Sequence, residues 1–356
     1  MFRRPWIFAA AALAVLLCVR QTRAFAQQSD STQTPTSPAK PDEIDILGRP
    51  AETPVAPSTP SLPKVKIPNF TSCSIAELQK KVPELAHLKV AQDQAQLAAL
   101  LDGIGARTIE IARKTPNLIS HEAVVSEQGH IARRQNFSYL VLQHALGPGS
   151  LVLDEFRVDM ASGEKFQTEE IEKAIAAKSQ DSASSPPQLH SLDRLVPESD
   201  GPPLSQGFVN AWVYFYPPNR PQAEFRYLGD QKMDGHQTRV VAFAQTPGSV
   251  RMPARIGYAN KTFPIFLQGV AWVDVTDFRI VRLQTDLLLP PPGVPLHQIT
   301  ADIQFAETHI AEMASPLWLP RQVVVTTSLG GTTRIERHTY SGFRLFRAKS
   351  KVLLNP

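Results

Sequence analysis

Apolar and polar residues alternate through much of the second half of the chain, and this pattern indicates a large antiparallel sheet. Residues 278–289 show it clearly, because Val281 and Leu283 share one side of the expected strand with polar neighbours between them. Hairpin turns are expected at Asp234-Gly235 and Gly330-Gly331. Further strands are expected at 135–143, 151–159, 223–228, 237–245, 264–273, 298–308, 321–329 and 332–346.

Helical spacing appears N-terminal to these strands. Ser74 and Glu77 have the spacing of a capping box, which predicts a short helix that begins at Ser74. Between Asp93 and Ile111, apolar residues recur near helical spacing, but Gly103 and Gly105 interrupt them. This stretch therefore predicts a broken amphipathic helix.

Together these elements predict an α+β fold. Its main part is a large curved antiparallel sheet, shaped like a half-barrel and covered by N-terminal and central helices, because a sheet of this size must curl or be covered. We expect one domain over 69–348, with a disordered Pro- and Ser-rich insertion at about 178–206. A disordered Pro-rich tether at 27–68 precedes it, and a tail at 349–356 follows.

The N-terminus has the features of a secretory signal peptide, expected to comprise residues 1–26. Two arginines precede an uncharged, mostly apolar run at 5–19, which is shorter than the roughly 20 residues that a membrane-spanning helix needs. Ala24-Phe25-Ala26 offers small residues at the cleavage site. We therefore expect a mature chain that begins at Gln27, lies in the periplasm or is secreted, and has no transmembrane anchor after cleavage.

Loss of the signal peptide changes the charge balance. The whole chain has 37 Lys and Arg against 33 Asp and Glu, and residues 1–26 contain four arginines and no acid. The mature chain is thus formally neutral, which argues against a nucleic-acid partner. Residues 321–351 remain locally basic. They form either a solvated strand face or a patch for anionic head groups or envelope polymers.

The cysteine content excludes several kinds of site. Cys18 lies in the signal peptide, so Cys73 is the one cysteine left in the mature chain. An intramolecular disulfide, a four-cysteine zinc site and a C-x-x-C redox pair are therefore excluded. Stability must come from a hydrophobic core.

Motifs of enzyme active sites are missing from the sequence. It has no G-x-S-x-G, G-x-x-x-x-G-K-[ST], G-x-G-x-x-G or H-E-x-x-H motif, and His121-Glu122 lacks the second histidine. His309 and His338 lie in expected strands and could meet across the sheet, although two such histidines are usually ordinary surface or core residues. We predict no metal site, no cofactor and no catalytic residue.

The acid pair Asp274 and Asp277 frames an expected turn. Turn formation explains both aspartates, since Asp side chains cap turn backbone. A pair of carboxylates could also hold calcium, or act as acid and base, so a carboxylate-dependent hydrolase is kept as an unfavoured alternative.

Aromatic residues supply the candidate ligand contacts. Trp212, Tyr214 and Phe215 crowd into the expected short helix at 208–215, just after the insertion, and Trp272 lies in the expected strand at 264–273. Core packing explains them all. The alternative is that residues 208–215 form the plug or lip of an apolar cavity, and we take these four aromatics as the candidate ligand-binding residues.

One region resembles a known superfamily. The run Gly269–Asp274 followed by Phe278–Leu283, with the preceding Phe225–Gly229 and Thr238–Phe243 hairpin, resembles the LolA-like lipoprotein-carrier superfamily over about 223–346. The resemblance implies an unclosed half-barrel sheet around a helical plug, with acyl chains or lipoproteins bound on the concave side. The overall layout is also similar to exported bacterial proteins that share the segment around Cys73.

These inferences favour a non-enzymatic cell-envelope protein. We expect it to bind an apolar or lipidic ligand, such as a lipid or lipoprotein, or a partner protein of the envelope, on the concave face of the sheet. The alternative is an interaction or sensory module whose concavity is filled by its own side chains. A mostly apolar cavity of roughly 300–1,000 Å³ would distinguish the first from the second.

Overall fold

The computed structural model describes residues 68–147, 150–162, 205, 207–250, 253–258 and 261–346. The predicted signal peptide at 1–26 and tail at 349–356 lie outside the described residues. So do the tether at 27–68 and the insertion at 178–206, apart from Pro68 and Ser205.

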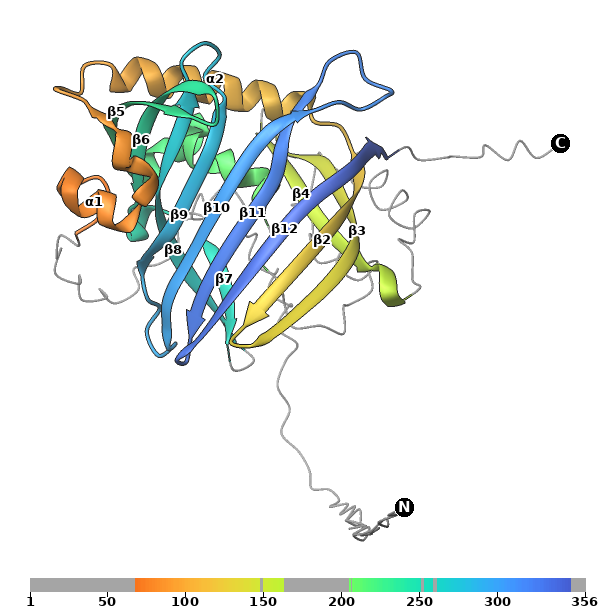
Figure 1. The fold of residues 1–356 in the computed structure, drawn as a ribbon. Helices are drawn as coiled ribbons and strands as arrows, with labels where there is room; N and C mark the ends of the chain where they lie inside the picture. Colours follow the sequence, from red (N-terminus) through yellow and green to blue (C-terminus); the bar gives the residue numbers. More distant parts are fainter. Residues whose placement is uncertain are drawn as a thin grey trace, which may run out of the picture. The chain divides into compact units, whose positions relative to one another are not determined.

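Within the described residues, a 12-stranded antiparallel sheet dominates the fold (Figure 1). Its strands are β1 (Lys89–Val90), β2 (Leu118–Gln128), β3 (Ile131–Gly147), β4 (Ser150–Asp159), β5 (Ala223–Met233), β6 (His236–Gln245), β7 (Ala254–Tyr258), β8 (Lys261–Asp274), β9 (Ile280–Leu289), β10 (Leu296–Thr308), β11 (Leu317–Leu329) and β12 (Thr332–Leu345). They follow the order β1-β5-β6-β8-β9-β10-β11-β12-β2-β3-β4, with β7 paired to β8 alone. The first hairpins of the chain thus dock onto its last strand.

Short helices accompany the sheet. They are α1 (Ile75–Lys81), η1 (Pro83–His87), α2 (Leu97–Lys114), η2 (Met160–Ser162), η3 (Phe208–Phe215), η4 (Pro217–Gln222) and η5 (Pro247–Ser249), where η marks a 3₁₀-helix. The capping box is confirmed, since the Glu77 backbone N–H donates to the Ser74 hydroxyl and the Glu77 carboxylate accepts from the Ser74 N–H. The predicted short helix at 208–215 is also confirmed.

The prediction of a broken helix is wrong, because α2 continues without interruption through Gly103 and Gly105. Each glycine instead permits a close approach. A Cβ atom at Gly103 would lie 2.5 Å from the Phe278 ring, and one at Gly105 would lie 2.1 Å from the Arg220 guanidinium. No real Cβ sits that close to another heavy atom, so glycine lets the turn before β9 and the η4 segment pack directly on α2.

The sheet is bowed, with α2 and η3 on its concave side (Figure 1). Strands that lie far apart in the sheet order contact the same helices. Helix α2 contacts β4, β5 and β11, and η3 contacts β4 and β11. A flat sheet could not bring these strands to one helix. The predicted fold class, a large curved antiparallel sheet covered by helices, is confirmed.

The two faces of the sheet carry separate hydrophobic cores. The concave core gathers Phe215, Phe243, Leu283 and Val323 with α2 and η3. The convex core lies under α1 and η1; it gathers Phe70, Leu78, Val240, Val270 and Trp272. Residues of β8 alternate between the two cores, with Val270 and Trp272 in one and Ala271 and Val273 in the other. The expectation that Val281 and Leu283 share one side of their strand is wrong. A register shift where β9 pairs with Trp272 and Val273 puts Val281 in the convex core and Leu283 in the concave core.

Strand β2 was not predicted. Its residues alternate between buried and half-buried, as in other strands, but two of the inward positions are Ser120 and Glu122. Because polar residues occupy core positions, the hydrophobic pattern of a strand is absent from the sequence there.

Candidate functional site

The concave face is filled by η3, which we call the plug (Phe208–Phe215). Phe215 is fully buried, and its ring centroid lies 5.7 Å from that of Phe243 and 5.6 Å from that of Phe225. Tyr214 stacks on Phe243 at 4.6 Å between centroids, and Trp212 is buried in the same core. The structure therefore brings together three of the four predicted ligand-binding residues.

Trp272, the fourth candidate, lies on the opposite face. Its side chain is fully buried in the convex core, and its indole N–H donates to Gln231 Oε1 over 3.3 Å. The Arg282 guanidinium carbon sits 5.7 Å from the centre of its ring. Trp272 therefore cannot share a concave site with the residues of the plug.

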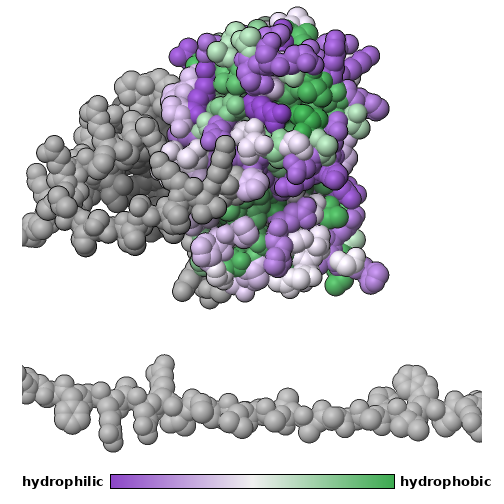
Figure 2. All heavy atoms as spheres, turned by 90° about the vertical axis from the view of Figure 1, so that its left-hand side faces the viewer, coloured by the Kyte–Doolittle hydropathy of each residue, from purple (hydrophilic) through white to green (hydrophobic). Residues whose placement is uncertain are grey.

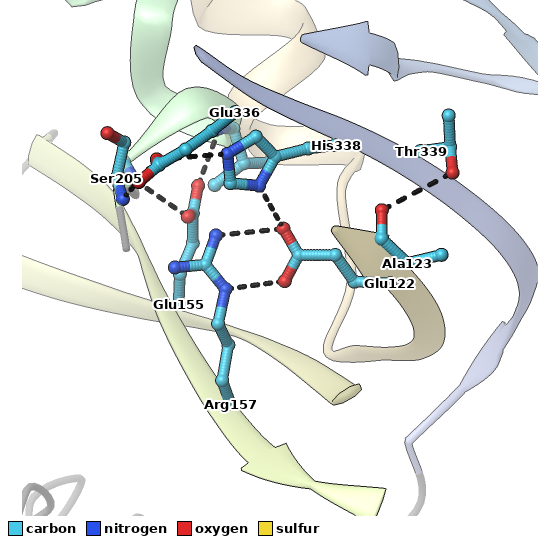
Figure 3. A network of polar contacts seen from close by, with 10 residues as sticks. Glu122, Ala123, Glu155, Arg157, Ser205, Glu336, His338 and Thr339 are labelled. Atoms are coloured by element: carbon cyan, nitrogen blue, oxygen red, sulfur yellow. Dashed lines mark hydrogen bonds and ion pairs between the residues drawn. The ribbon is translucent and has the colours of Figure 1, made fainter. Parts of the chain in front are cut away.

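Next to the plug, β2, β4 and β12 place a group of buried and half-buried charged residues that we call the concave charged cluster (Figure 3). It consists of Glu122, Glu155, Arg157, Glu336 and His338. Arg157 binds the Glu122 carboxylate with two nitrogens, Nη2 at 2.8 Å from Oε1 and Nε in contact with Oε2. His338 Nδ1 lies 2.9 Å from Glu122 Oε1.

A second carboxylate flanks the other side of the His338 ring. His338 Nε2 is 3.5 Å from Glu336 Oε2, and Glu336 Oε1 is 2.9 Å from Arg334 Nε. The Phe208 ring of the plug meets the imidazole edge-on with centroids 5.1 Å apart. The plug thus covers the imidazole while two carboxylates hold it.

Burial and pairing act against each other in the cluster. Burial alone would raise the pKa of Glu122, but the hydrogen bond with His338 and the Arg157 charge outweigh it, and the pKa is lowered. Burial alone would lower the pKa of His338, but its contacts with Glu122 and Glu336 raise it. The arrangement favours a protonated imidazolium between two ionised carboxylates.

Two carboxylates of the cluster anchor the start of the plug. Glu155 accepts the backbone N–H groups of Gly207 at 2.7 Å and Val209 at 2.6 Å, and Glu336 accepts that of Ser205 at 3.0 Å. Burial raises the pKa of Glu155, although Arg157 and the two backbone donors oppose the shift. These are charge-assisted hydrogen bonds, roughly twice as strong as neutral ones.

Asn210 ties the plug to the edge of the sheet. Its side-chain oxygen accepts the Leu153 N–H at 3.2 Å, and its side-chain nitrogen donates to the Leu153 carbonyl oxygen. One amide thereby satisfies both backbone groups of a residue in β4, which lies at an end of the sheet. The plug is fixed by polar contacts at its first turn and by apolar packing beyond it.

The cluster can hold and share protons, but the plug and its own burial separate it from solvent. Glu122, Glu336 and His338 are each no more than 1% exposed, so a substrate could reach them only after the plug had moved. Sequence reasoning missed this cluster, because Glu122 was weighed only beside His121 for a zinc motif. Its partners come from 35 and 216 residues away.

The other residues singled out in the sequence do not join this site. Asp274 accepts the Thr276 backbone N–H at 2.7 Å and contacts His236 Nδ1 at 2.7 Å, while Asp277 accepts the Arg279 N–H at 3.0 Å. Both aspartates therefore cap turn backbone, as their turn role requires. His309 is exposed at the end of β10 whereas His338 is buried, so the two do not meet.

The described residues meet the requirements of a surface pocket but not those of a metal site or a membrane-spanning helix. A depression of about 590 Å³ lies near α1, and one of about 550 Å³ lies at the edge of β5. The second is lined by Phe225, whose ring contacts Phe215 of the plug. In the same described part of the chain, no three His, Cys, Asp or Glu side chains are grouped to hold a metal ion. No helix there combines the length and apolar character that crossing a bilayer demands.

Comparisons with known proteins give similarity to solved structures alone. No family model matches the chain, and no curated protein matches it. A LolA superfamily protein from Nitrosomonas europaea is 11% identical, with 70% of this chain and 94% of that chain covered and a TM-score of 0.34. A putative outer membrane lipoprotein-sorting protein domain from Vibrio parahaemolyticus is 11% identical, with coverage of 71% and 94% and a TM-score of 0.35. A DUF1329 family protein from Desulfovibrio piger has the same identity and coverage with a TM-score of 0.34. The first of these belongs to the superfamily that residues 223–346 resemble.

Proposed function

We propose that this is an exported, non-enzymatic protein of the cell envelope that binds an apolar chain on the concave face, in the space that the plug occupies. The single observation that carries the proposal is the composition of the surface under the plug. It is lined by the concave core, including Val241, Phe243, Leu283 and Val323, with the charged cluster at one side. Such a surface suits a ligand with an apolar chain and a polar head.

The local structure of the plug supports its displacement. A 3₁₀-helix of eight residues is long for a conformation that rarely exceeds three or four. It begins after Gly207, whose φ of 96° favours glycine, and it ends at Phe215, with Tyr216 between it and Pro217-Pro218 at the start of η4. The segment can therefore leave as a unit, with its ends as hinges.

The polar side of the surface supports recognition of a head group. Ser120 Oγ and Gln135 Nε2 are buried on the same face of β2 and β3, and neither has a hydrogen-bond partner within the described structure. Buried polar atoms normally find partners. A ligand with acceptor oxygens would supply them.

The test compares binding of a fluorescent fatty acid by wild type and by Glu155→Gln. This substitution weakens the charge-assisted bonds to Gly207 and Val209, each worth about 1.5–3 kcal/mol. If the plug must open, the open fraction rises and the apparent affinity should rise at least tenfold. Glu312→Gln changes the same charge on an exposed residue of the β10–β11 loop and serves as the matched control.

The second candidate is an interaction module whose concavity stays filled. The complete burial of Phe215 favours it, since this ring packs against Phe225 and Phe243 in the concave core. Absence of fatty-acid binding by both wild type and Glu155→Gln would select this candidate and reject the first. Mass spectrometry of extracts from protein purified from its native compartment gives an independent answer, because a bound lipid should appear in stoichiometric amount.

A further inference from the structure

Strand β5 forms an edge of the sheet for most of its length. Its neighbour β1 pairs with it at only two positions, Lys89 with Asp230 and Val90 with Gly229. The Ala91 N–H extends this contact by donating to the Leu228 carbonyl oxygen at 2.9 Å. On the side of β5 away from β6, no other strand among the described residues lies N-terminal to Leu228.

Gln94 continues the pairing with a side chain. Its Oε1 accepts the Tyr227 N–H at 2.8 Å, and its Nε2 donates to the Tyr227 carbonyl oxygen at 2.9 Å. The amide thus does for Tyr227 what a neighbouring strand would do, as Asn210 does for Leu153 at the other end of the sheet. The outer edge of β5 accepts strand-like partners.

The next outward-facing residue of β5 lies in an open slot. Tyr227 points its backbone groups away from β6, and alternation along an antiparallel strand gives Phe225 the same direction. No described residue bonds to these groups of Phe225. A depression of about 550 Å³ lies here, lined by Thr71, Gln94, Leu97, Glu224, Phe225 and Arg226.

The slot has two chemically different walls. Phe225 belongs with Leu97 to the concave core, and both are only partly buried, so this wall is apolar. Glu224 and Arg226 point to the other face, beside Thr71 and Cys73. Arg226 donates to the Cys73 carbonyl oxygen at 2.7 Å, whereas Oε2 of exposed Glu224 accepts from Thr71 and Asn69.

We propose that this slot, between Thr71 and Leu97 at the edge of β5, binds an extended peptide of a partner polypeptide as an added strand. The peptide residue opposite Phe225 is apolar and packs on Phe225 and Leu97. Its neighbours face the other wall, where a basic residue complements Glu224 and an acidic one complements Arg226. Main-chain hydrogen bonds to Phe225 give affinity, and the alternating walls give specificity.

Figure 2 views the side on which α1 and β5 lie, where hydrophobic and hydrophilic residues are intermixed at the surface.

The test uses a labelled peptide, Thr-Val-Glu-Val-Lys-Val-Thr, and the full exported chain. In antiparallel pairing its central Val lies opposite Phe225 and its Lys opposite Glu224. Its first two residues stay unpaired, because Gln94 and Ala91 already occupy the edge beyond. We expect saturable fluorescence anisotropy, and an affinity about tenfold lower when the central Val is replaced by Pro, which cannot donate a backbone bond. In nuclear magnetic resonance, the peptide should slow hydrogen exchange at the Phe225 amide.

A charge swap locates the binding site. Glu224→Lys should weaken the peptide about fivefold, and a peptide with Glu in place of Lys should recover that loss on this variant alone. Glu312→Lys makes the same change on a remote exposed residue and should have no effect.

Three results would overturn the assignment. The first is the absence of saturable binding, or equal binding of the Pro peptide. The second is binding only after deletion of residues 27–66, which would give the slot to the chain's own N-terminal segment. The third is a dimer, seen by light scattering without peptide and lost in Glu224→Lys, which would give the slot to a second copy of the chain.

Discussion

Replacing Trp272 should cost stability and leave ligand binding unchanged. The side chain is fully buried in the convex core among residues such as Val240 and Val270. Trp272→Ala removes that packing and should lower the free energy of unfolding by about 3–5 kcal/mol. At about 2–4 °C per kcal/mol for a domain of this size, the melting temperature should fall by about 6–20 °C.

Trp272→Phe separates the packing from the hydrogen bond. It keeps an aromatic ring but removes the indole N–H that Gln231 Oε1 accepts, while Gln231 Nε2 still donates to the Glu84 carbonyl oxygen. A buried acceptor left without a donor costs about 1–3 kcal/mol, so this variant should fall between wild type and Trp272→Ala.

Thermal melts with and without fluorescent fatty acid provide the assay, and Trp212→Ala is the control from the concave face. Trp212→Ala should change fatty-acid affinity, because Trp212 belongs to the plug, whereas Trp272→Ala should not. An unchanged melt for Trp272→Ala would mean that the ring is exposed and the register of β8 is wrong. A loss of fatty-acid binding at constant stability would place Trp272 in a ligand site and refute the assignment to the convex core.

Three further outcomes are expected. N-terminal sequencing of exported protein should begin at Gln27 and Cys18→Ser should leave export unchanged, whereas a lipid retained on Cys18 would contradict the signal-peptide assignment. Gly103→Ala should lower the free energy of unfolding by about 1–3 kcal/mol, because the new Cβ would meet the Phe278 ring. A rise of about 1 kcal/mol, the usual result of this change within a helix, would show that Phe278 does not pack on α2. The raised pKa of His338 stabilises the folded state fully below the unfolded pKa of about 6.5, and this stabilisation is lost as pH rises through the folded pKa. The free energy of unfolding, measured in urea between about pH 6 and 9, should therefore fall with rising pH, and His338→Gln should abolish this fall.

The sheet could be predicted because its signals are local. Alternation in β8 assigned the right residues to each face, and Asp234-Gly235 and Gly330-Gly331 adopt the positive φ angles that their hairpins need. In β9 the assignment failed, because a bulge is not visible in the alternation and it moves Val281 to the face opposite Leu283. Alternation separates the two faces of a strand, but it does not indicate which face is concave. Trp272 and Trp212 were therefore grouped as candidates for one site although they lie in different cores.

The charged cluster could not be predicted because its signals are not local. Nothing near Glu122 in the sequence indicates that Arg157 and His338 will surround it, and its own strand lacks the hydrophobic pattern. The wrong prediction at Gly103 has a related reason. In the sequence, a glycine that breaks a helix cannot be distinguished from one that makes room for a side chain from a distant turn, such as Phe278.

The pairing of Glu122 with His338 also bears on how the two ends of the chain find each other during folding. Strands β2 and β12 must join across more than two hundred residues, and a slip of two residues would still place inward-facing side chains inward, since the pleat repeats every two. Apolar burial alone would discriminate poorly against such a slip. A slip that places His338 opposite Ser126 would, however, separate the imidazole from the Glu122 carboxylate and leave buried charges unpaired, at about 3–5 kcal/mol. The cluster thus disfavours this shifted alignment of the strands, and variants that lose the cluster should populate it beside the native register.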